Sequence, residues 1–447
     1  MNAINTKYET VVGLEIHVEL STNTKMFCRC AVPTLSDEPN TRTCPVCLGL
    51  PGALPFTNQK AIESCVQIGL ALNCAINQDS YFERKNYFYP DLAKGFQTSQ
   101  FLLPFAEKGY LDIKIGETTK RIGVTRVHME EDTGKLTHAT VEGKEVSLID
   151  FNRSSVPLVE IVTEPDIRSG EEAKAFLTEL QRIIRYLNVS DADMEKGHMR
   201  LEPNISLRPH GQTTLAKYKV EVKNINSFKF VDHAIKFEEK RHAELLDKGE
   251  TPIQETRGWN EFKSKTVSQR SKEEAHDYRY FPEPDIPPIR FSSQATEDIR
   301  HKIPELPNAK IERFVKEFGL SVYNSEILIR DKGLADYFEK AIEDGKNLGV
   351  EAKAIASYII NKKPNLEGME TSSLVKKVKD ENTVESFDEE KLKTGITKVM
   401  EANKGIVDEY KTGKVQVLGF LIGAVRREIP EATDMDQIRK TLSKMLE

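Results

Sequence analysis

The chain has 447 residues, which is more than one typical domain and enough for two or three. It contains 64 basic and 70 acidic residues, a net charge of −6, so the composition excludes a protein that is basic throughout. Local patches of positive charge remain compatible with binding to nucleic acid. No apolar run approaches a membrane span and the N-terminus lacks the pattern of a signal peptide, so we expect a cytoplasmic protein with reduced cysteines.

The first predicted element is a strand with the sequence "GLEIHVEL", residues 13–20. Its strict alternation places Glu15, His17 and Glu19 on one face and the apolar side chains on the other. One interpretation is a half-buried strand whose outer face is solvated. The other is a site for a divalent cation or for acid–base chemistry, because an imidazole between two carboxylates can hold a metal ion.

Four of the six cysteines follow within a short stretch, as a C-x-C pair and a C-x-x-C pair. They are Cys28, Cys30, Cys44 and Cys47. This spacing predicts one tetrahedral metal site in the loop 28–47, with zinc favoured, an iron–sulfur cluster as the alternative, and four unrelated core cysteines as the structural explanation. Zinc held by four thiolates has no open position and is structural. Cys65 and Cys74 lie in a stretch with helical spacing and are predicted to fill the core.

Short alternating segments then predict strands, among them "YLDIKI", "KRIGVTRVHME", "EVSLIDFN" and "PLVEIVTE". An amphipathic helix is predicted over 170–187 with Ser169 as its N-cap, and a second over 232–249. The region therefore has an α+β pattern with a largely antiparallel sheet. A proline-rich segment, 281–290, precedes a region with helical patterns only. We divide the chain into domains 1–293, 294–368 and 369–447.

Further carboxylates occur in or beside the predicted strands. "RVHMEEDTGK" contains His128, Glu130 and Glu131, and Glu160 stands alone in an apolar run. A carboxylate buried there needs a partner, because burying an unpaired charge is costly. Together with Glu15 and His17, Glu160 and one of Glu130 or Glu131 would form an oxygen-rich site suited to Mg²⁺, which usually also binds nucleotide phosphate.

Several clusters of polar residues offer groups that could bind phosphate, although each alone is also typical of a solvated strand face. These candidates are Arg84, Lys85, Asn86, Tyr87, Tyr89, Gln97, Asn152, Arg153, Ser154, Ser155, Arg200, Asn204, Ser206, Arg208, Lys223 and Asn224. The sequence contains neither a P-loop nor a G-x-G-x-x-G motif, so an ATP site would be of another type. The residues by themselves therefore indicate Mg²⁺-dependent phosphoryl chemistry and no more specific function.

Six stretches together resemble the B subunit of the tRNA-dependent amidotransferases. They are "VVGLEIHVEL", "CPVCLGLPGALP", "RKNYFYPDLAKGFQTSQ", "HMEEDTGK", "DFNRSSVPLVEIVTEPD" and "DYRYFPEPDIPP", in order along nearly all of residues 8–290. The resemblance implies a cradle-like ATP- and Mg²⁺-dependent kinase domain followed by a helical tail that binds tRNA. It implies conversion of Glu-tRNA(Gln) to Gln-tRNA(Gln), of Asp-tRNA(Asn) to Asn-tRNA(Asn), or both.

The resemblance also implies a mechanism and partners. ATP phosphorylates the side-chain carboxylate of the misacylated amino acid, and ammonia then displaces phosphate. The ammonia comes from a separate amidase (glutaminase) subunit, while a small third subunit makes the assembly a heterotrimer. No amidase signature is evident in this sequence, which fits that division of labour.

By motif, the resemblance makes Glu15, His17, Glu131 and Glu160 the Mg²⁺ ligands and catalytic residues, with Glu130 open as an alternative to Glu131. It makes Lys85 a further catalytic residue. It makes these residues candidates for ATP, the acyl phosphate or the tRNA end: Asn86, Tyr87, Tyr89, Arg153, Asn204, Arg208, Lys223 and Asn224.

Two departures from the family pattern concern the tail. The helical region before "DEEKLKTGITKVM" is shorter than is usual, and "RREIPEATDMDQIRK" lacks the usual Gly/Lys-rich turn. Two rival hypotheses remain. One is a non-catalytic tRNA-binding or assembly protein held together by zinc. The other is a stand-alone ATP-dependent ligase, which the missing ammonia-producing half disfavours.

Overall fold

The structure is a computed structural model that describes residues 7–271, 277–382, 389–412, 414–429 and 435–446. The chain forms two compact units, residues 1–309 and 310–447, which are described separately. None of the helices within the described residues combines the length and the apolar character that a membrane span requires.

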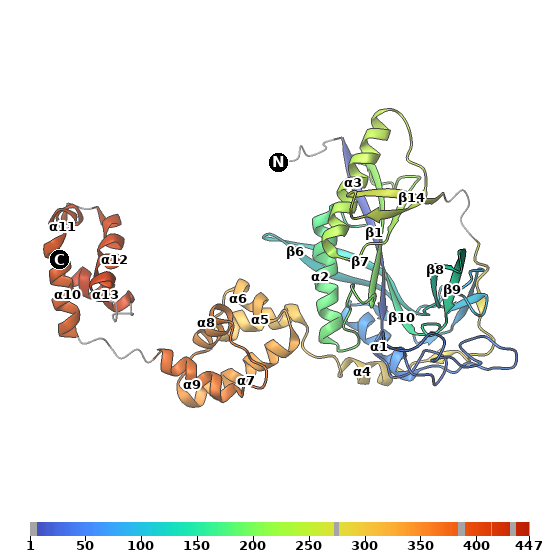
Figure 1. The fold of residues 1–447 in the computed structure, drawn as a ribbon, viewed down its shortest axis with the longest axis horizontal. Helices are drawn as coiled ribbons and strands as arrows, with labels where there is room; N and C mark the ends of the chain where they lie inside the picture. Colours follow the sequence, from blue (N-terminus) through green and yellow to red (C-terminus); the bar gives the residue numbers. More distant parts are fainter. Residues whose placement is uncertain (1–6, 272–276, 383–388, 413, 430–434, 447) are drawn as a thin grey trace. The chain divides into compact units, whose positions relative to one another are not determined.

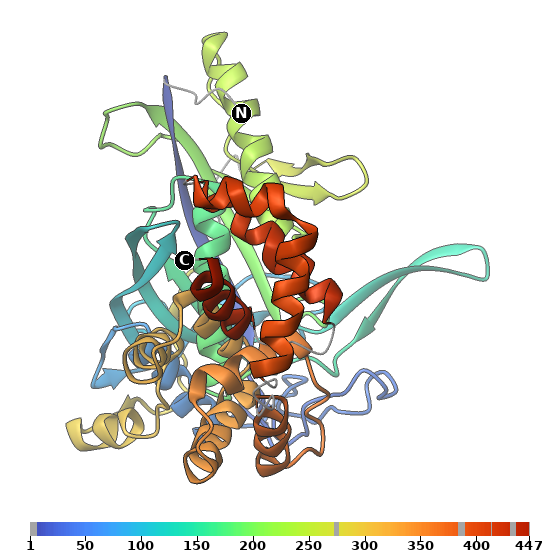
Figure 2. The same cartoon turned by 90° about the vertical axis from the view of Figure 1, so that its left-hand side faces the viewer.

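The first unit contains a nine-stranded sheet that is antiparallel throughout except where β12 and β13 pair in parallel. In spatial order the strands are β14 (Lys265–Ser271), β13 (Glu255–Asn260), β12 (Val220–Lys223), β11 (Met199–Pro209), β1 (Tyr8–Glu19), β10 (Pro157–Thr163), β7 (Thr118–Glu131), β6 (Ala106–Ile115) and β2 (Ala75–Ile76). Both views show the long strand β1, in dark blue, extending from beside α3 toward the blue segments that contain the cysteine loop and α1 (Figures 1 and 2).

Three smaller sheets complete the strands of this unit. They are β15 (Phe281–Pro282) with β4 (Glu83–Asn86) and β5 (Phe96–Ser99), then β16 (Ile289–Arg290) with β3 (Asp79–Ser80), and the hairpin of β8 (Lys135–Val141) and β9 (Lys144–Asp150). The helices of the unit are α1 (Gln59–Ala71), α2 (Gly170–Tyr186), α3 (Phe228–Asp247) and α4 (Ser293–Arg300). The α4 helix packs on α1, so it belongs to the first unit.

One hydrophobic core lies between the sheet and α1, α2 and α3, because the apolar residues of strand and helix share faces. Leu14, Ile16 and Val18 of β1 are fully buried in it, as the alternation in "GLEIHVEL" predicts. The predicted face of α2 is buried in the same core, and the Ser169 hydroxyl accepts a hydrogen bond from the Glu172 amide at the helix start. Cys65 and Cys74 are buried there, which confirms their predicted role as core residues.

The second unit contains helices only within its described residues. They are α5 (Pro307–Phe318), α6 (Val322–Leu328), α7 (Lys332–Leu348), α8 (Ala352–Lys362), α9 (Thr371–Asn382), α10 (Glu389–Ala402), α11 (Lys404–Lys411), the short 3₁₀ helix η1 (Val415–Val417), α12 (Leu418–Glu428) and α13 (Met435–Leu446). The α9 helix packs on α7 and α8, whereas α10 to α13 share a core of their own. The predicted class, an α+β region followed by helices, is confirmed. Part of the predicted polar linker, 383–388, lies outside the described residues.

Candidate active site and metal centre

The polar face of the sheet gathers its side chains through the register of three neighbouring strands. His17 of β1 pairs with Glu160 of β10, and Glu160 pairs with His128 of β7. Glu130 lies two residues beyond His128 and therefore on the same face of β7. Antiparallel pairing thus brings His17 beside residues that are more than 100 positions away in the sequence.

The first acidic group consists of His17, Glu130 and Glu160, whose ligand atoms all lie within 4.8 Å of one another. His17 Nε2 lies 3.2 Å from Glu130 Oε1 and 3.5 Å from Glu160 Oε2. His128 Nε2 lies 3.3 Å from the same Glu160 oxygen. One imidazole and two buried carboxylates are a donor set that fits a divalent cation.

The electrostatics of this group favour a carboxylate beside a charged imidazole. Burial alone would raise the pKa of Glu160, but the charge of His128 and hydrogen bonds with Glu130, His128 and His17 hold it well below its ordinary value. Burial would lower the pKa of His17, but the hydrogen bonds with Glu130 and Glu160 raise it well above 6.5. A cation placed here would therefore compete with the proton on His17 for the same carboxylates.

Glu131 lies in a different environment from Glu130. Its carboxylate forms an ion pair with Lys94 and accepts a hydrogen bond of 2.8 Å from the Thr98 amide. Its second oxygen, Oε2, is buried and has no hydrogen-bond partner among the described residues. Of the four residues predicted to bind Mg²⁺, the structure therefore brings His17 and Glu160 together, with Glu130 beside them.

Glu15 belongs to a second acidic group, with Glu202 and Glu221, whose ligand atoms also lie within 4.8 Å of one another. The Lys223 ammonium lies 2.9 Å from Glu202 and 3.6 Å from Glu221. The Asn204 amide donates a hydrogen bond of 2.9 Å to Glu15. Sequence reasoning missed Glu202 and Glu221. Strand alternation could have predicted them, because Glu202 lies two residues from Asn204 and Glu221 two residues from Lys223.

A cavity of about 320 Å³ lies against the second group on the same face of the sheet. Residues of β1, β10 and β11 and the segment before β12 form its wall. It is lined by Val11, Gly13, Leu14, Glu15, Val162, Thr163, Pro165, Asn204, Ser206, Leu215, Ala216, Lys217, Tyr218, Lys219 and Gln254. The wall is largely apolar with a few polar groups, which is the character of a small-molecule site.

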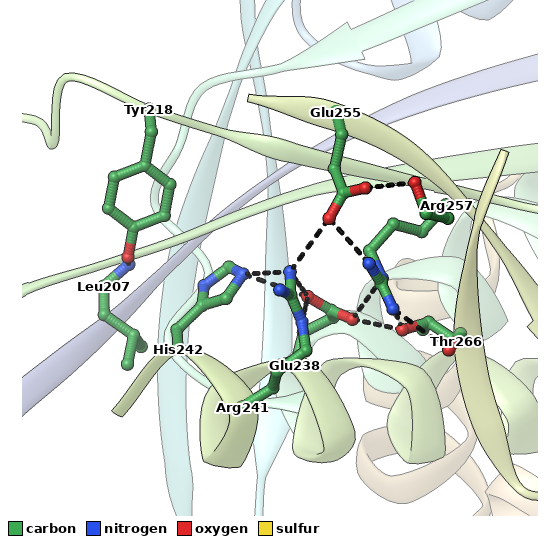
Figure 3. A network of polar contacts seen from close by, with 9 residues as sticks. Leu207, Tyr218, Glu238, Arg241, His242, Glu255, Arg257 and Thr266 are labelled. Atoms are coloured by element: carbon green, nitrogen blue, oxygen red, sulfur yellow. Dashed lines mark hydrogen bonds and ion pairs between the residues drawn. The ribbon is translucent and has the colours of Figure 1, made fainter. Parts of the chain in front are cut away.

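The ring of the cavity residue Tyr218 packs on His242, which belongs to a buried network of charged residues (Figure 3). The Tyr218 hydroxyl accepts a hydrogen bond of 3.1 Å from the Leu207 amide. Glu238, which is fully buried, contacts His242 Nε2 at 2.9 Å and Arg241 at 2.7 Å. Arg257 of β13 lies 3.2 Å from the other oxygen of Glu238. The network therefore joins α3 to the β13–β14 hairpin.

The predicted phosphate-binding residues are placed in several ways. The pKa of Lys85 is raised because the charges of Glu130, Tyr280 and Glu160 together outweigh the effect of burial. Arg153 donates to the Gly134 carbonyl at 2.7 Å, and Asn86 donates to the Arg279 carbonyl at 2.8 Å. Arg208 binds Glu9 at 2.7 Å, and Tyr87 contacts Gln97 at 3.4 Å.

Two predicted residues of this set are exposed. Tyr89 has 59 % of its surface exposed, and Asn224 is an exposed residue in the left-handed backbone region, with φ of 60°.

The four sulfur atoms of Cys28, Cys30, Cys44 and Cys47 lie within 4.8 Å of one another, and all four thiols are free. Cys28 and Cys47 are buried. The hydrogen bond with Cys28 and the positive charge of Lys25 outweigh burial and lower the pKa of Cys47 to about 5. Burial raises the pKa of Cys30 to about 11. Four converging thiols with one already favoured as thiolate fit a tetrahedral metal ion.

This chain is similar to known proteins over nearly its whole length. A family model described as GatB/GatE catalytic domain matches residues 10–297, and a second, described as GatB domain, matches residues 350–446. The B subunit of the aspartyl/glutamyl-tRNA(Asn/Gln) amidotransferase of Dehalococcoides mccartyi (strain CBDB1) is 44 % identical over 99 % of both chains. The proteins of the same name from Carboxydothermus hydrogenoformans and Persephonella marina are 42 % and 43 % identical, over 98 % of this chain and 100 % of theirs. This chain belongs to the amidotransferase B-subunit family.

Membership in the B-subunit family places both acidic groups, the cavity and the four cysteines within the catalytic-domain match. The alignment with the Dehalococcoides relative extends over 490 positions, more than the 447 residues present here. The relative therefore contains residues that this chain lacks, and their predicted location in the helical region stays a prediction.

Proposed function

We propose that this member of the B-subunit family carries the kinase and amidation site of a tRNA-dependent amidotransferase. Its substrates would be Glu-tRNA(Gln), Asp-tRNA(Asn) or both, and its products the corresponding amides. The observation that carries the proposal is the convergence of His17, Glu130 and Glu160 beside the Glu15 group on one face of the sheet, next to a cavity. The substrates follow from the names of the relatives.

The acidic face would bind Mg²⁺ through Glu130, Glu160 and His17, with the Glu15 group as a neighbouring site. Bound Mg²⁺ supplies positive charge that lowers the repulsion between ATP and a substrate carboxylate. His128 orients Glu160 through their contact at 3.3 Å. Lys85 adds a cation near the same carboxylates, where the transferred phosphoryl group would carry negative charge.

The cavity is suited to the nucleoside part of ATP. Strand β1 contributes Val11 and Gly13 to the cavity, Glu15 at its edge and His17 to the first acidic group. Six residues of a strand span about 20 Å, which is long enough for a nucleoside triphosphate to lie along it. The base would pack on the apolar wall near Tyr218, and Asn204 and Ser206 would offer polar contacts.

The second step requires partners. Ammonia would attack the carbonyl carbon of the acyl phosphate, a C–N bond would form and phosphate would leave. We propose that the ammonia is produced by an amidase (glutaminase) subunit, and that this chain, the amidase and a small third subunit form a cytoplasmic heterotrimer. The relatives are named as B subunits, which supports an assembly of several subunits.

We further propose that the four cysteines bind one structural zinc ion, which would fix the loop 28–47 against the end of β1. The Ser154 hydroxyl donates to the Cys47 carbonyl at 3.0 Å, so this loop is also tied to the segment that precedes β10. Elemental analysis should find about one zinc per chain. Metal-free protein with an unchanged melting temperature would refute the assignment.

The experiment that tests the main proposal measures amide formation by the complex with ATP, Mg²⁺, glutamine and each misacylated tRNA in turn. ATP hydrolysis that depends on misacylated tRNA, together with Gln-tRNA or Asn-tRNA as product, is the expected result. Binding of tRNA without ATP turnover would instead support the non-catalytic assembly protein.

A further inference from the structure

Lys25 is a fully buried lysine at the edge of the four-cysteine group. It lies between the end of β1 and the first cysteine pair, and its amide donates a hydrogen bond of 3.0 Å to the Cys30 carbonyl. The side chain of Asn58 donates to the Lys25 carbonyl at 3.3 Å. The backbone of Lys25 is thus fixed on both sides. A fully buried ammonium is costly unless an anion or a set of acceptors accompanies it.

The acceptor that accompanies this ammonium is sulfur. Lys25 Nζ donates a hydrogen bond to Cys47 Sγ over 3.6 Å. Among the residues that the structure describes, no carboxylate lies within ion-pair distance of Lys25 Nζ. The contrast is Lys94, which lies in the same unit and pairs with the carboxylate of Glu131. The negative charge that offsets Lys25 must therefore come from the cysteine group.

The charges of a filled site explain why a cation would be placed there. Four thiolates around one divalent ion leave a formal charge of minus two in a partly buried loop. One ammonium at hydrogen-bond distance from a ligand sulfur reduces that charge. Donation to sulfur also withdraws electron density from the metal bond, which alone would weaken it. Beside the buried Cys47 sulfur, the cost of uncompensated charge is the larger of these two effects.

We propose that Lys25 is a positioning and charge-neutralising residue of the four-cysteine metal centre, which strengthens zinc binding through an Nζ–H···Sγ hydrogen bond to Cys47. This inference rests on the proposed zinc site and adds a residue that does not itself bind the metal. Removing a residue that hydrogen-bonds to a metal ligand commonly lowers metal affinity by about 10- to 100-fold.

The test compares the affinity for zinc of Lys25→Met, Lys25→Arg and the wild type within the full chain, by competition with a chromophoric chelator. Lys25→Met removes the charge and keeps an unbranched side chain, so zinc affinity should fall by about 10-fold or more. Lys25→Arg keeps the charge and should lose less. The control is Lys60→Met, at an exposed lysine, which should bind zinc as the wild type does.

A second measurement is alkylation of the zinc-loaded protein with iodoacetamide, which should be faster for Lys25→Met than for Lys60→Met. If Lys25→Met does not fold, the zinc affinity of Lys25→Arg still tests the proposal. An affinity close to that of the wild type supports the role of charge. Equal zinc affinity of Lys25→Met and the wild type would overturn the role of Lys25 while leaving the zinc site intact. A wild-type chain that binds no zinc would overturn both, and amide formation by the complex, measured separately, would report on the enzyme.

Discussion

At the scale of single residues, the site depends on which carboxylates share a face. Glu160 lies at the centre of the first group, since it contacts both His17 and His128. Its buried charge is tolerated because two imidazoles face it and the pKa of the carboxyl stays well below its ordinary value. An ionised carboxylate in this position can bind a cation or balance the charge of the imidazoles, so its charge is more important to the site than its volume.

Replacing Glu160 by Gln should separate chemistry from folding. The change keeps the size of the side chain and removes its charge, so ATP-dependent activation of the misacylated tRNA should fall by about 100-fold, as for a lost metal ligand. Glutaminase activity of the partner should persist at least in part. The matched control is Glu164→Gln, an exposed carboxylate just beyond β10, which should be nearly neutral. Normal amide formation by Glu160→Gln and Glu15→Gln at limiting Mg²⁺ would refute the assignment.

Glu130 and Glu131 offer a sharper comparison, because they are adjacent in the sequence and differ in surroundings. Glu130→Gln should raise the Mg²⁺ concentration needed for half-maximal amide formation by about 10-fold or more, since Glu130 lies 3.2 Å from His17. Glu131→Gln should lower the melting temperature instead, because it leaves Lys94 without its buried partner. A Mg²⁺ titration and a melting curve of both variants test these two expectations. If Glu131→Gln instead raised the Mg²⁺ requirement and Glu130→Gln lowered the melting temperature, Glu131 would be the metal ligand.

At the scale of elements, β1 illustrates what the sequence could predict. Alternation in "GLEIHVEL" separated the core face from the polar face correctly, because the period of a strand is fixed. The partners across the sheet could not be predicted, since the register of β1 with β10 and β11 is set by packing far away in sequence. For β7, the same alternation distinguishes Glu130 from Glu131. Val127 and Met129 are core residues, so Glu130 falls on the polar face and Glu131 on the other.

The network between α3 and the β13–β14 hairpin predicts how stability depends on pH. Burial raises the pKa of Glu238, but hydrogen bonds with His242, Arg241 and Thr266 outweigh it and lower the pKa to about 2, from an ordinary value of 4.5. A depressed carboxyl pKa stabilises the fold above pH 4.5, and this stabilisation is lost as the pH falls from 4.5 toward 2. The shift corresponds to roughly 3 kcal/mol. Burial also lowers the pKa of His242, so further stability should be lost as the pH falls below 6.5.

Melting curves of Glu238→Gln between pH 2 and 7 test this prediction. The variant should melt well below the wild type at pH 7, because Arg241 and Arg257 lose a buried partner. The difference should shrink as the pH falls from 4.5 toward 2, where the wild-type carboxyl becomes protonated. Glu244→Gln, an exposed carboxylate on the same helix, is the control. A difference in melting temperature that stays constant with pH would show that the pKa of Glu238 is not depressed.

At the scale of the whole molecule, both acidic groups, the cavity and the four cysteines lie in the first compact unit. The second unit contains helices only within its described residues. This division fits a protein in which one part transfers the phosphoryl group and another part holds the tRNA. In the proposed function, the ammonia comes from an amidase partner. The rate of amidation should therefore depend on the partner subunits, and the affinity for tRNA should depend on residues of the helices.

In the proposed heterotrimer, only the amidase subunit should hydrolyse glutamine. A heterotrimer with an inactivated amidase should form Gln-tRNA from ammonium salt and ATP, but not from glutamine. The wild-type complex should use either source. The readout is amide formation on misacylated tRNA, with the purified single chain as a further sample. Glutamine-dependent activity in that single-chain sample would contradict the assignment of ammonia production to a partner.

The tRNA binding predicted for the last helices should be separable from catalysis. The α10–α13 helices have their own core, and Arg426 and Arg427 are exposed at the end of α12. If these arginines contact phosphates, the double variant Arg426→Gln/Arg427→Gln should raise KM for misacylated tRNA about 10-fold while kcat stays near the wild-type value. The slope of log affinity against log salt concentration should decrease by up to about two, because each lost phosphate contact releases one counterion fewer. Lys362→Gln/Lys363→Gln, an exposed basic pair at the end of α8, is the control. An unchanged KM and salt slope would show that these arginines do not contact the tRNA, and a lower kcat would place them near the reaction instead.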